Sequence, residues 1–216
     1  MTMQRIDEPP IRVSSSPLYD TQRISSSLAA GNHRLFQSGI GSTANGFSGT
    51  SGPKTEIDTN LSRSGGLPMG QSYRVTSYGI LIRQRQLTAT SGTSAAAQAA
   101  ALDSQNLAGN IALSYIEGSL TRILGTLEMF PAGCGQSGVT VGSGAGVAAE
   151  EANWVNVNGL PAAGARYQLE SPILLRDGST FAFNLYAPNQ ITLISSSNSY
   201  DITVCLWGSS FQEVTQ

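Results

Sequence analysis

The chain has 216 residues, of which 40% are hydrophobic and only 12% are charged, with a formal net charge of −2. This composition is too apolar and too weakly charged for a wholly disordered protein, and the scarcity of Lys and Glu is not typical of a coiled coil. Two Cys and one His exclude the ordinary four-ligand zinc sites.

The charges are unevenly distributed along the chain. Residues 1–90 carry nine basic and five acidic groups, whereas residues 91–216 carry three basic and nine acidic groups. Eleven of the twelve cations are Arg, whose planar guanidinium suits bidentate hydrogen bonding at interfaces. The net charge provides no overall field for nucleic acid or an anionic membrane.

The first ten residues lack the apolar core of a signal peptide, and no segment reaches the ~18 consecutive apolar residues of a membrane span. We therefore expect synthesis in the cytosol, in a bacterial or viral setting. In such a reducing compartment Cys134 and Cys205 are expected to be free thiols.

The N-terminal region predicts an arm, short strands and a loop. Residues 1–16 contain Pro9-Pro10 and three consecutive Ser, which favour an extended arm. Residues 17–37 indicate short edge strands, and residues 38–53 form a Gly/Ser/Thr-rich loop. A short strand is predicted over residues 56–62.

The middle of the chain predicts strands around one helix. Residues 73–87 alternate as a strand at first, and the Ala-rich centre of residues 92–108 favours a helix. Residues 110–130 indicate two strands around a turn at 117–119, although one long helix is an alternative. Residues 131–165 are rich in Gly and Ala and form a long loop.

The last third predicts four strands in quick succession. Asp177-Gly178 lies between two apolar runs and predicts a tight hairpin. In the final run Tyr200, Ile202, Val204 and Leu206 share one face. The four predicted strands cover residues 167–175, 180–187, 190–194 and 200–207.

About eight short strands with turns between them predict an all-β fold, an eight-stranded antiparallel β-sandwich of the jelly-roll kind with one inserted short helix. The predicted organisation is an extended arm over residues 1–16 and a single domain over residues 17–216. The domain carries long loops at 38–53 and 131–165. Strands and helices do not alternate along the chain, so the sequence does not predict a parallel sheet.

Residues for enzyme chemistry are scarce. His33 is the only His and is predicted to lie at the surface or an interface, because no nucleophile motif accompanies it. Acidic residues are scattered, and the Gly-rich segment 139–150 has Val147 where a dinucleotide fingerprint requires Gly. We therefore expect no enzyme activity, no cofactor, no metal and no small-molecule substrate.

Aromatic residues divide into two groups. Together the aromatic residues could form a sugar-binding platform, but those in phase with apolar strand faces are predicted to lie in the core: Tyr73, Tyr78, Phe181, Phe183 and Tyr200. Trp154 anchors the 131–165 loop, and Trp207 lies opposite the apolar face of its strand. These two tryptophans are the candidate exposed aromatic residues.

Several stretches suggest a family. They are Ser16-Pro-Leu-Tyr-Asp-Thr-Gln-Arg23, Ile57-Asp-Thr-Asn-Leu61, Gly66-Leu-Pro-Met-Gly-Gln-Ser-Tyr-Arg-Val75, Leu169-Glu-Ser-Pro-Ile-Leu-Leu-Arg-Asp-Gly-Ser-Thr-Phe181 and Asp201-Ile-Thr-Val-Cys-Leu-Trp207. In layout, over residues 17–90 and 166–208, the chain resembles the single jelly-roll capsid proteins of tailless icosahedral bacteriophages and related viruses. Residues 91–165 contribute nothing to this likeness.

The resemblance implies a virion protein, made in the host cytoplasm, whose copies assemble with one another and with other capsid proteins into capsomers. The terminal arm would reach a neighbouring subunit and would also be the contact to an internal membrane or the genome. The candidate arm residues are Arg5, Arg12, Arg23 and Arg34, and a chain carrying Arg12→Glu and Arg23→Glu is expected to assemble poorly. The rival interpretation is a β-sandwich receptor-binding or carbohydrate-binding module on a virion or cell surface.

Overall fold

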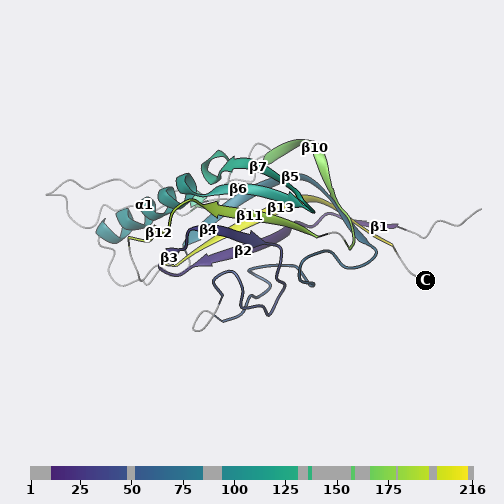
Figure 1. Cartoon of the computed structure of the whole chain (residues 1–216), viewed down its shortest axis with the longest axis horizontal. Helices are drawn as coiled ribbons and strands as arrows, with labels where there is room; N and C mark the ends of the chain where they lie inside the picture. The colour runs from purple at the N-terminus through teal and green to yellow at the C-terminus, as the bar shows by residue number, and fades with distance from the viewer. Residues whose placement is uncertain are drawn as a thin grey trace, which may run out of the picture.

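The structure is a computed structural model that describes residues 11–47, 52–84, 94–130, 136–137, 157–158, 166–178, 180–194 and 199–213. In these residues the strands pair antiparallel, and most of them belong to two sheets that face each other (Figure 1). One helix, α1 (Ser94–Asn110), lies at the end of the sandwich near β12 (Figure 1). The predicted all-β class, with antiparallel sheets and one short helix, is confirmed.

The first sheet has the order β1-β13-β5-β10, and β2 also pairs with β13. β2 pairs with the first half of β13, and β1 pairs with its last residues, so both lie along the same long strand. The strands of this sheet are β1 (Ile11–Ser14), β2 (Leu18–Ile24), β5 (Gln71–Gln84), β10 (Tyr167–Leu175) and β13 (Tyr200–Glu213).

The second sheet has the order β4-β11-β6-β7. Its strands are β4 (Gly31–Leu35), β6 (Ala112–Glu117), β7 (Leu120–Thr126) and β11 (Phe181–Ala187). Two short pairs complete the described strands: β3 (Ser27–Leu28) with β12 (Ile191–Thr192), and β8 (Gln136–Ser137) with β9 (Val157–Asn158). A short 3-10 helix, η2 (Leu127–Met129), follows β7.

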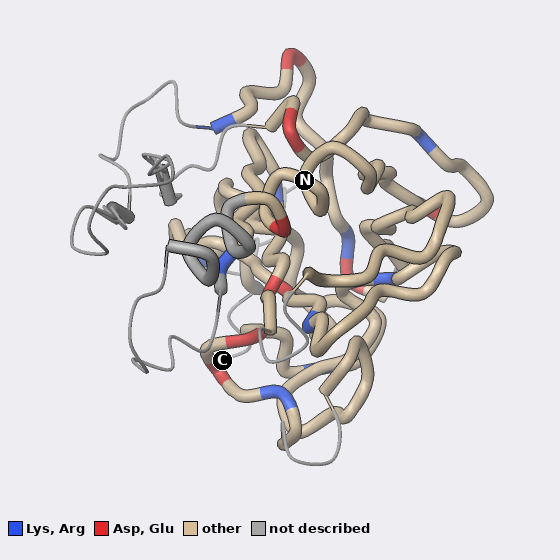
Figure 2. The backbone as a smooth tube through the Cα atoms, turned by 90° about the vertical axis from the view of Figure 1, so that its left-hand side faces the viewer, with Lys and Arg blue, Asp and Glu red and all other residues tan. Residues whose placement is uncertain are grey.

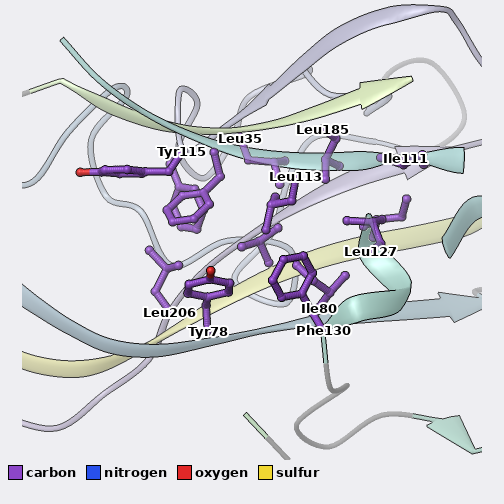
Figure 3. Packing of buried hydrophobic residues seen from close by; sticks show 14 of the residues in the cluster. Leu35, Tyr78, Ile80, Ile111, Leu113, Tyr115, Leu127, Phe130, Leu185 and Leu206 are labelled. Carbon is purple, nitrogen blue, oxygen red and sulfur yellow. The ribbon is translucent and has the colours of Figure 1, made fainter. Parts of the chain in front are cut away.

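The core lies between the two sheets, as the period-two pattern of the strands requires. Tyr78, Ile80 and Leu206 of the first sheet point toward Leu35, Leu113 and Leu185 of the second (Figure 3). The in-phase aromatic residues predicted for the core are all buried there, which confirms that prediction. They are Tyr73, Tyr78, Phe181, Phe183 and Tyr200.

Several predicted elements are confirmed with shifted ends. The helix predicted within 92–108 is α1, and residues 110–130 contain the two strands β6 and β7 around a turn at Gly118. The alternative of one long helix there is wrong. The strand predicted over 73–87 is β5, and the strand predicted over 200–207 continues to Glu213.

Two local predictions are wrong, one of a strand and one of a strand pairing. No strand forms over 56–62, where the described residues make turns and one isolated bridge between Thr59 and Asp20. Asp177-Gly178 does form a turn, but the strands it connects do not pair, because β10 pairs with β5 and β11 pairs with β4 and β6. A turn dipeptide reports the local backbone and carries no information about which sheet the next strand joins.

The predicted arm and loops lie only partly within the described residues. Residues 11–14 of the arm form β1, which is a strand of the first sheet of the same subunit. Residues 1–10 lie outside the described residues, as does most of the 131–165 loop, including Cys134. Cys205 forms no disulfide within the described residues.

Candidate functional site

The four predicted arm residues lie in different environments. Arg12 is exposed on β1, opposite Gln212 of β13, and Arg34 is exposed on β4. Arg23 is buried in β2, with 4% of its surface exposed. Arg5 lies outside the described residues. The structure therefore does not bring the three described cations together on one surface.

Arg23 is the centre of a buried ion-pair cluster. Its Nε donates to Asp201 Oδ1 at 3.0 Å, and its Nη2 lies 3.2 Å from Asp58 Oδ1. Arg83 adds a contact of 3.6 Å to the other oxygen of Asp201. Two guanidinium groups thus balance two carboxylates, as burial of charge requires. The prediction that Arg23 contacts a neighbouring subunit is corrected by this placement, because its charge is used inside the subunit.

A second buried pair joins β2 to the connection between β4 and β5. Lys54 Nζ lies 2.6 Å from Asp20 Oδ1, and both side chains are fully buried. Asp20 Oδ2 also accepts a hydrogen bond of 2.6 Å from the backbone N–H of Phe36. Burial raises the pKa of Asp20, while Lys54 and the hydrogen bonds act in the opposite direction.

The Asp20 hydrogen bond supports an unusual backbone conformation. Phe36 has a φ of +65°, a left-handed value that is strained for a bulky residue. Its ring packs against Phe181 and Phe183, with centroid distances of 5.6 Å to each. The carboxylate of Asp20 and these two rings therefore hold the chain in position as it leaves β4.

We call residues 36–47 and 52–61 the edge cover, because they lie against the free edge of β2. Asn60 Oδ1 accepts from the backbone N–H of Tyr19 at 3.0 Å, and the backbone N–H of Asn60 donates to the carbonyl of Tyr19 at 3.3 Å. Further along, the N–H of Arg23 donates to the carbonyl of Asn45 at 2.9 Å. These bonds satisfy backbone groups that an edge strand would otherwise offer to another chain.

The buried ring of Phe47 packs the edge cover against Arg23 of β2. Its ring is fully buried, with the guanidinium carbon of Arg23 at 4.0 Å and Lys54 Nζ at 5.6 Å from the ring centroid. Gly46 precedes it with a φ of +79°, and a Cβ at this position would lie 2.0 Å from the carbonyl oxygen of Arg23. Only glycine permits this approach, so the cover closes tightly on β2.

Among the described residues, no segment covers β1 in the way that the edge cover protects β2. All four of its residues are exposed, and Ile11 and Val13 each expose 60% of their surface. Ile11 and Val13 are two residues apart and therefore point to the same face of the strand. The edge at β1 presents an apolar pair to solvent in the described structure.

The opposite edge of the sandwich also exposes apolar side chains. β7 and β10 are the outermost strands of their sheets there, and they run along the upper side of Figure 1 while β2 runs along the lower side. Ile123 of β7 exposes 80% of its surface, and Leu120 of β7 and Leu174 of β10 are also exposed. Apolar side chains thus occupy both edges of the same sandwich.

Of the two candidate exposed aromatic residues, Trp207 is half-buried on β13 and Trp154 lies outside the described residues. Trp207 lines a surface cavity and lies under Arg166, whose guanidinium carbon is 4.5 Å from the indole centroid. Sequence reasoning identified Trp207 from its phase on the strand and missed Arg166, because no short-range pattern connects the two.

The remaining candidate features of the sequence are His33, groups of metal-ligating side chains and membrane-spanning segments. His33 lies in β4, where its Nε2 is 2.9 Å from the carbonyl of Ala29. In the described part of the chain, no three His, Cys, Asp or Glu side chains gather as metal ligands would. The helix of the described structure has neither the length nor the apolar character to cross a membrane. Basic and acidic positions are interspersed over the described backbone (Figure 2).

Comparison with known proteins adds no relative: no family model, no curated protein and no solved structure matches this chain.

Proposed function

We propose that this chain is a virion structural protein, a capsid subunit that assembles with copies of itself into the capsomers of an icosahedral shell. The proposal includes a jelly-roll winding for the sandwich. The support comes from the strand pairings, from the two exposed edges and from the resemblance of the sequence.

The strand pairings support the jelly-roll winding. Taking the longer strands after β1 in chain order, the first pairs with the last (β2 with β13), and the second with the seventh (β4 with β11). The third pairs with the sixth (β5 with β10), and the fourth with the fifth (β6 with β7). These are the rungs of one long hairpin, and rolling such a hairpin produces a jelly roll.

The exposed apolar side chains at opposite edges are the observation that carries the functional proposal, because a fold alone does not define a function. A contact between different patches on two copies is head-to-tail, and such contacts repeat to give closed rings or larger assemblies. Ile11 and Val13 supply one patch, and Ile123 of β7 supplies the apolar side chain at the other edge. Each contact is small, so assembly would depend on many contacts acting together.

Assembly of the full chain tests the proposal. We expect mass photometry and negative-stain microscopy to find rings or closed shells, and Ile123→Lys or Val13→Lys to leave mostly monomers at the same concentration. A charged side chain at either patch would have to be desolvated on contact, which opposes association. The matched control is Ile194→Lys, which alters an equally exposed Ile that follows β12 and lies on neither edge.

The control should assemble like the unchanged protein. A chain that stays monomeric or trimeric at every salt concentration would overturn the proposal. Normal rings from both Ile123→Lys and Val13→Lys would equally overturn it, because the two edges would then not be the contacts.

A further inference from the structure

We propose that the surface cavity at Arg166 and Trp207 binds a negatively charged sugar, that is, a saccharide unit that carries a carboxylate, phosphate or sulfate group. This site does not depend on the assembly proposed above. It lies on the outer face of the first sheet, because Trp207 points away from the side where its neighbour Leu206 is buried in the core.

The cavity has a volume of about 400 Å3, which lies within the range of small-ligand sites. Four segments that are distant in sequence form its walls: the link between β1 and β2, β5, the residue preceding β10, and β13. The walls include Ser15, Ser16, Thr76, Arg166, Trp207 and Ser209. Four of these six residues carry hydroxyl groups. Those of Ser15 and Thr76 donate to backbone carbonyls of the protein and can accept hydrogen bonds from sugar hydroxyls, and those of Ser16 and Ser209 can both donate and accept.

A β-bulge builds the floor of the cavity. Trp207 lies opposite Ser77 and Gly208 lies opposite Val75, so Thr76 has no opposite residue on β13. The Thr76 hydroxyl donates to the carbonyl of Trp207 at 3.2 Å. Bulges of this kind redirect side chains and are frequent beside functional sites.

The floor is held rigidly from the core side. The Tyr73 hydroxyl is 2.7 Å from the carbonyl of Ser16 and 3.1 Å from the carbonyl of Leu206, so it ties the β1–β2 link to β13. At Gly208 an added Cβ would lie 1.8 Å from the carbonyl oxygen of Arg74, so the two strands are as close there as glycine allows. A cavity that is already formed loses little entropy when a ligand binds.

Arg166 provides the charge. Its guanidinium carbon lies over the indole ring of Trp207, 4.5 Å from the centroid, and it makes no ion pair with a carboxylate in the part of the chain that the structure describes. A guanidinium that contacts an aromatic ring through its face keeps its N–H edges available for hydrogen bonds. Those edges match two oxygens of a carboxylate, phosphate or sulfate in a bidentate arrangement.

Arg166 differs in this respect from Arg23 and Arg83, which both contact the buried carboxylate of Asp201. Together, an oriented guanidinium, an indole and a ring of hydroxyls match an anionic group attached to a polyhydroxyl ring. A bare anion would use only the guanidinium, and a neutral sugar would leave it without a partner.

Titration of the full chain with small probes tests the site, read out by ligand-observed NMR. The probes are sialyllactose, glucose 6-phosphate and galactose 6-sulfate for the three anionic groups, lactose as the neutral sugar, and sodium acetate and sodium phosphate as bare anions. We expect at least one charged sugar to bind tenfold or more tightly than lactose and than both bare anions. The charged sugar that binds identifies the anionic group.

Two variants locate the binding. Arg166→Gln keeps much of the stacking area and removes the charge, and it should weaken the charged sugar at least tenfold. The matched control Arg34→Gln removes an exposed Arg from β4 and should leave binding unchanged. Equal binding of lactose, equal binding of the bare anions, no binding of any probe, or unaltered binding by Arg166→Gln would each overturn the proposal.

Discussion

At the scale of single residues, identical side chains have opposite roles according to where the fold places them. Arg23 lies on β2 and Arg34 on β4, and both were predicted to serve the same arm. Arg34 is exposed, whereas Arg23 is buried between two carboxylates. The function of each guanidinium is therefore decided by its partners, and among the described arm candidates Arg12 on β1 and Arg34 on β4 remain exposed.

Truncation of Arg23 should lower the stability of the folded chain and should not weaken an interface between subunits. We expect Arg23→Ala to lower the free energy of unfolding by about 3–5 kcal/mol, because it leaves Asp58 and Asp201 buried with less compensation. Arg34→Ala should change it by less than about 0.5 kcal/mol. Urea denaturation of both variants measures the difference, and a loss below 1 kcal/mol for Arg23→Ala would contradict the structural role assigned to the cluster.

At the scale of elements, the strand register of the first sheet shifts at the same position along β5 toward both of its neighbours, β13 and β10. The β5–β13 register shifts between Trp207 and Gly208, and the β5–β10 register shifts between Gln168 and Ile173. Pro172 lies within the second irregularity, as expected for a residue that cannot donate to the ladder. This interruption positions Trp207 and Arg166, so it links the sheet to the proposed sugar site.

Two glycine substitutions should have opposite effects on stability. Gly208→Ala should lower the free energy of unfolding by about 1–3 kcal/mol, because its Cβ would collide with the carbonyl oxygen of Arg74. Gly109→Ala in α1 should raise it by about 0.5–1 kcal/mol, since its Cβ would meet only an ordinary contact of 3.6 Å with Glu128. Thermal and urea unfolding compare the two, and a neutral Gly208→Ala would show that the strands approach less closely than described.

At the scale of the whole molecule, the sandwich buries tyrosine rings between its sheets. Burial raises the pKa of Tyr73 to about 12, and it also raises the pKa of Tyr78 and Tyr115. In the unfolded chain these hydroxyls ionise near pH 10. The folded state therefore holds protons that the unfolded state releases, and the stability from these groups is complete below pH 10.

Stability should fall as the pH rises above 10, through the interval up to the folded pKa of about 12 for Tyr73. We expect tyrosinate absorbance at 295 nm to appear in two phases, with the buried rings ionising together with the loss of near-ultraviolet circular dichroism. A single phase near pH 10 with the fold intact would contradict the burial of these side chains.

Much of the fold could be predicted from local pattern. The alternation in residues 200–207 assigned Tyr200, Ile202, Val204 and Leu206 to the core and left Trp207 on the other face, and both assignments hold. The same rule placed Phe181 and Phe183 correctly. Apolar periodicity is a property of neighbouring residues, so sequence is sufficient to read it.

The local sequence pattern could not predict which strands pair with each other. Asp177-Gly178 has the chemistry of a hairpin turn, yet β10 and β11 belong to different sheets. Each strand pairs instead with strands that are distant in sequence, because each sheet must bury one apolar face against the other. The predicted hairpin failed at this step, although the turn itself was identified.

The sequence by itself determined the all-β class, the single α-helix and the in-phase aromatic residues of the core, because these follow from periodicity and composition over short windows. Only the tertiary structure decided which polar residues are functional candidates. Asp58 and Asp201 lie 35 and 178 residues from Arg23, and Arg166 reaches Trp207 from a different strand connection. Charge and stacking interactions act through space, so the partners that bury one Arg and leave another at a cavity appear only when the two sheets have come together.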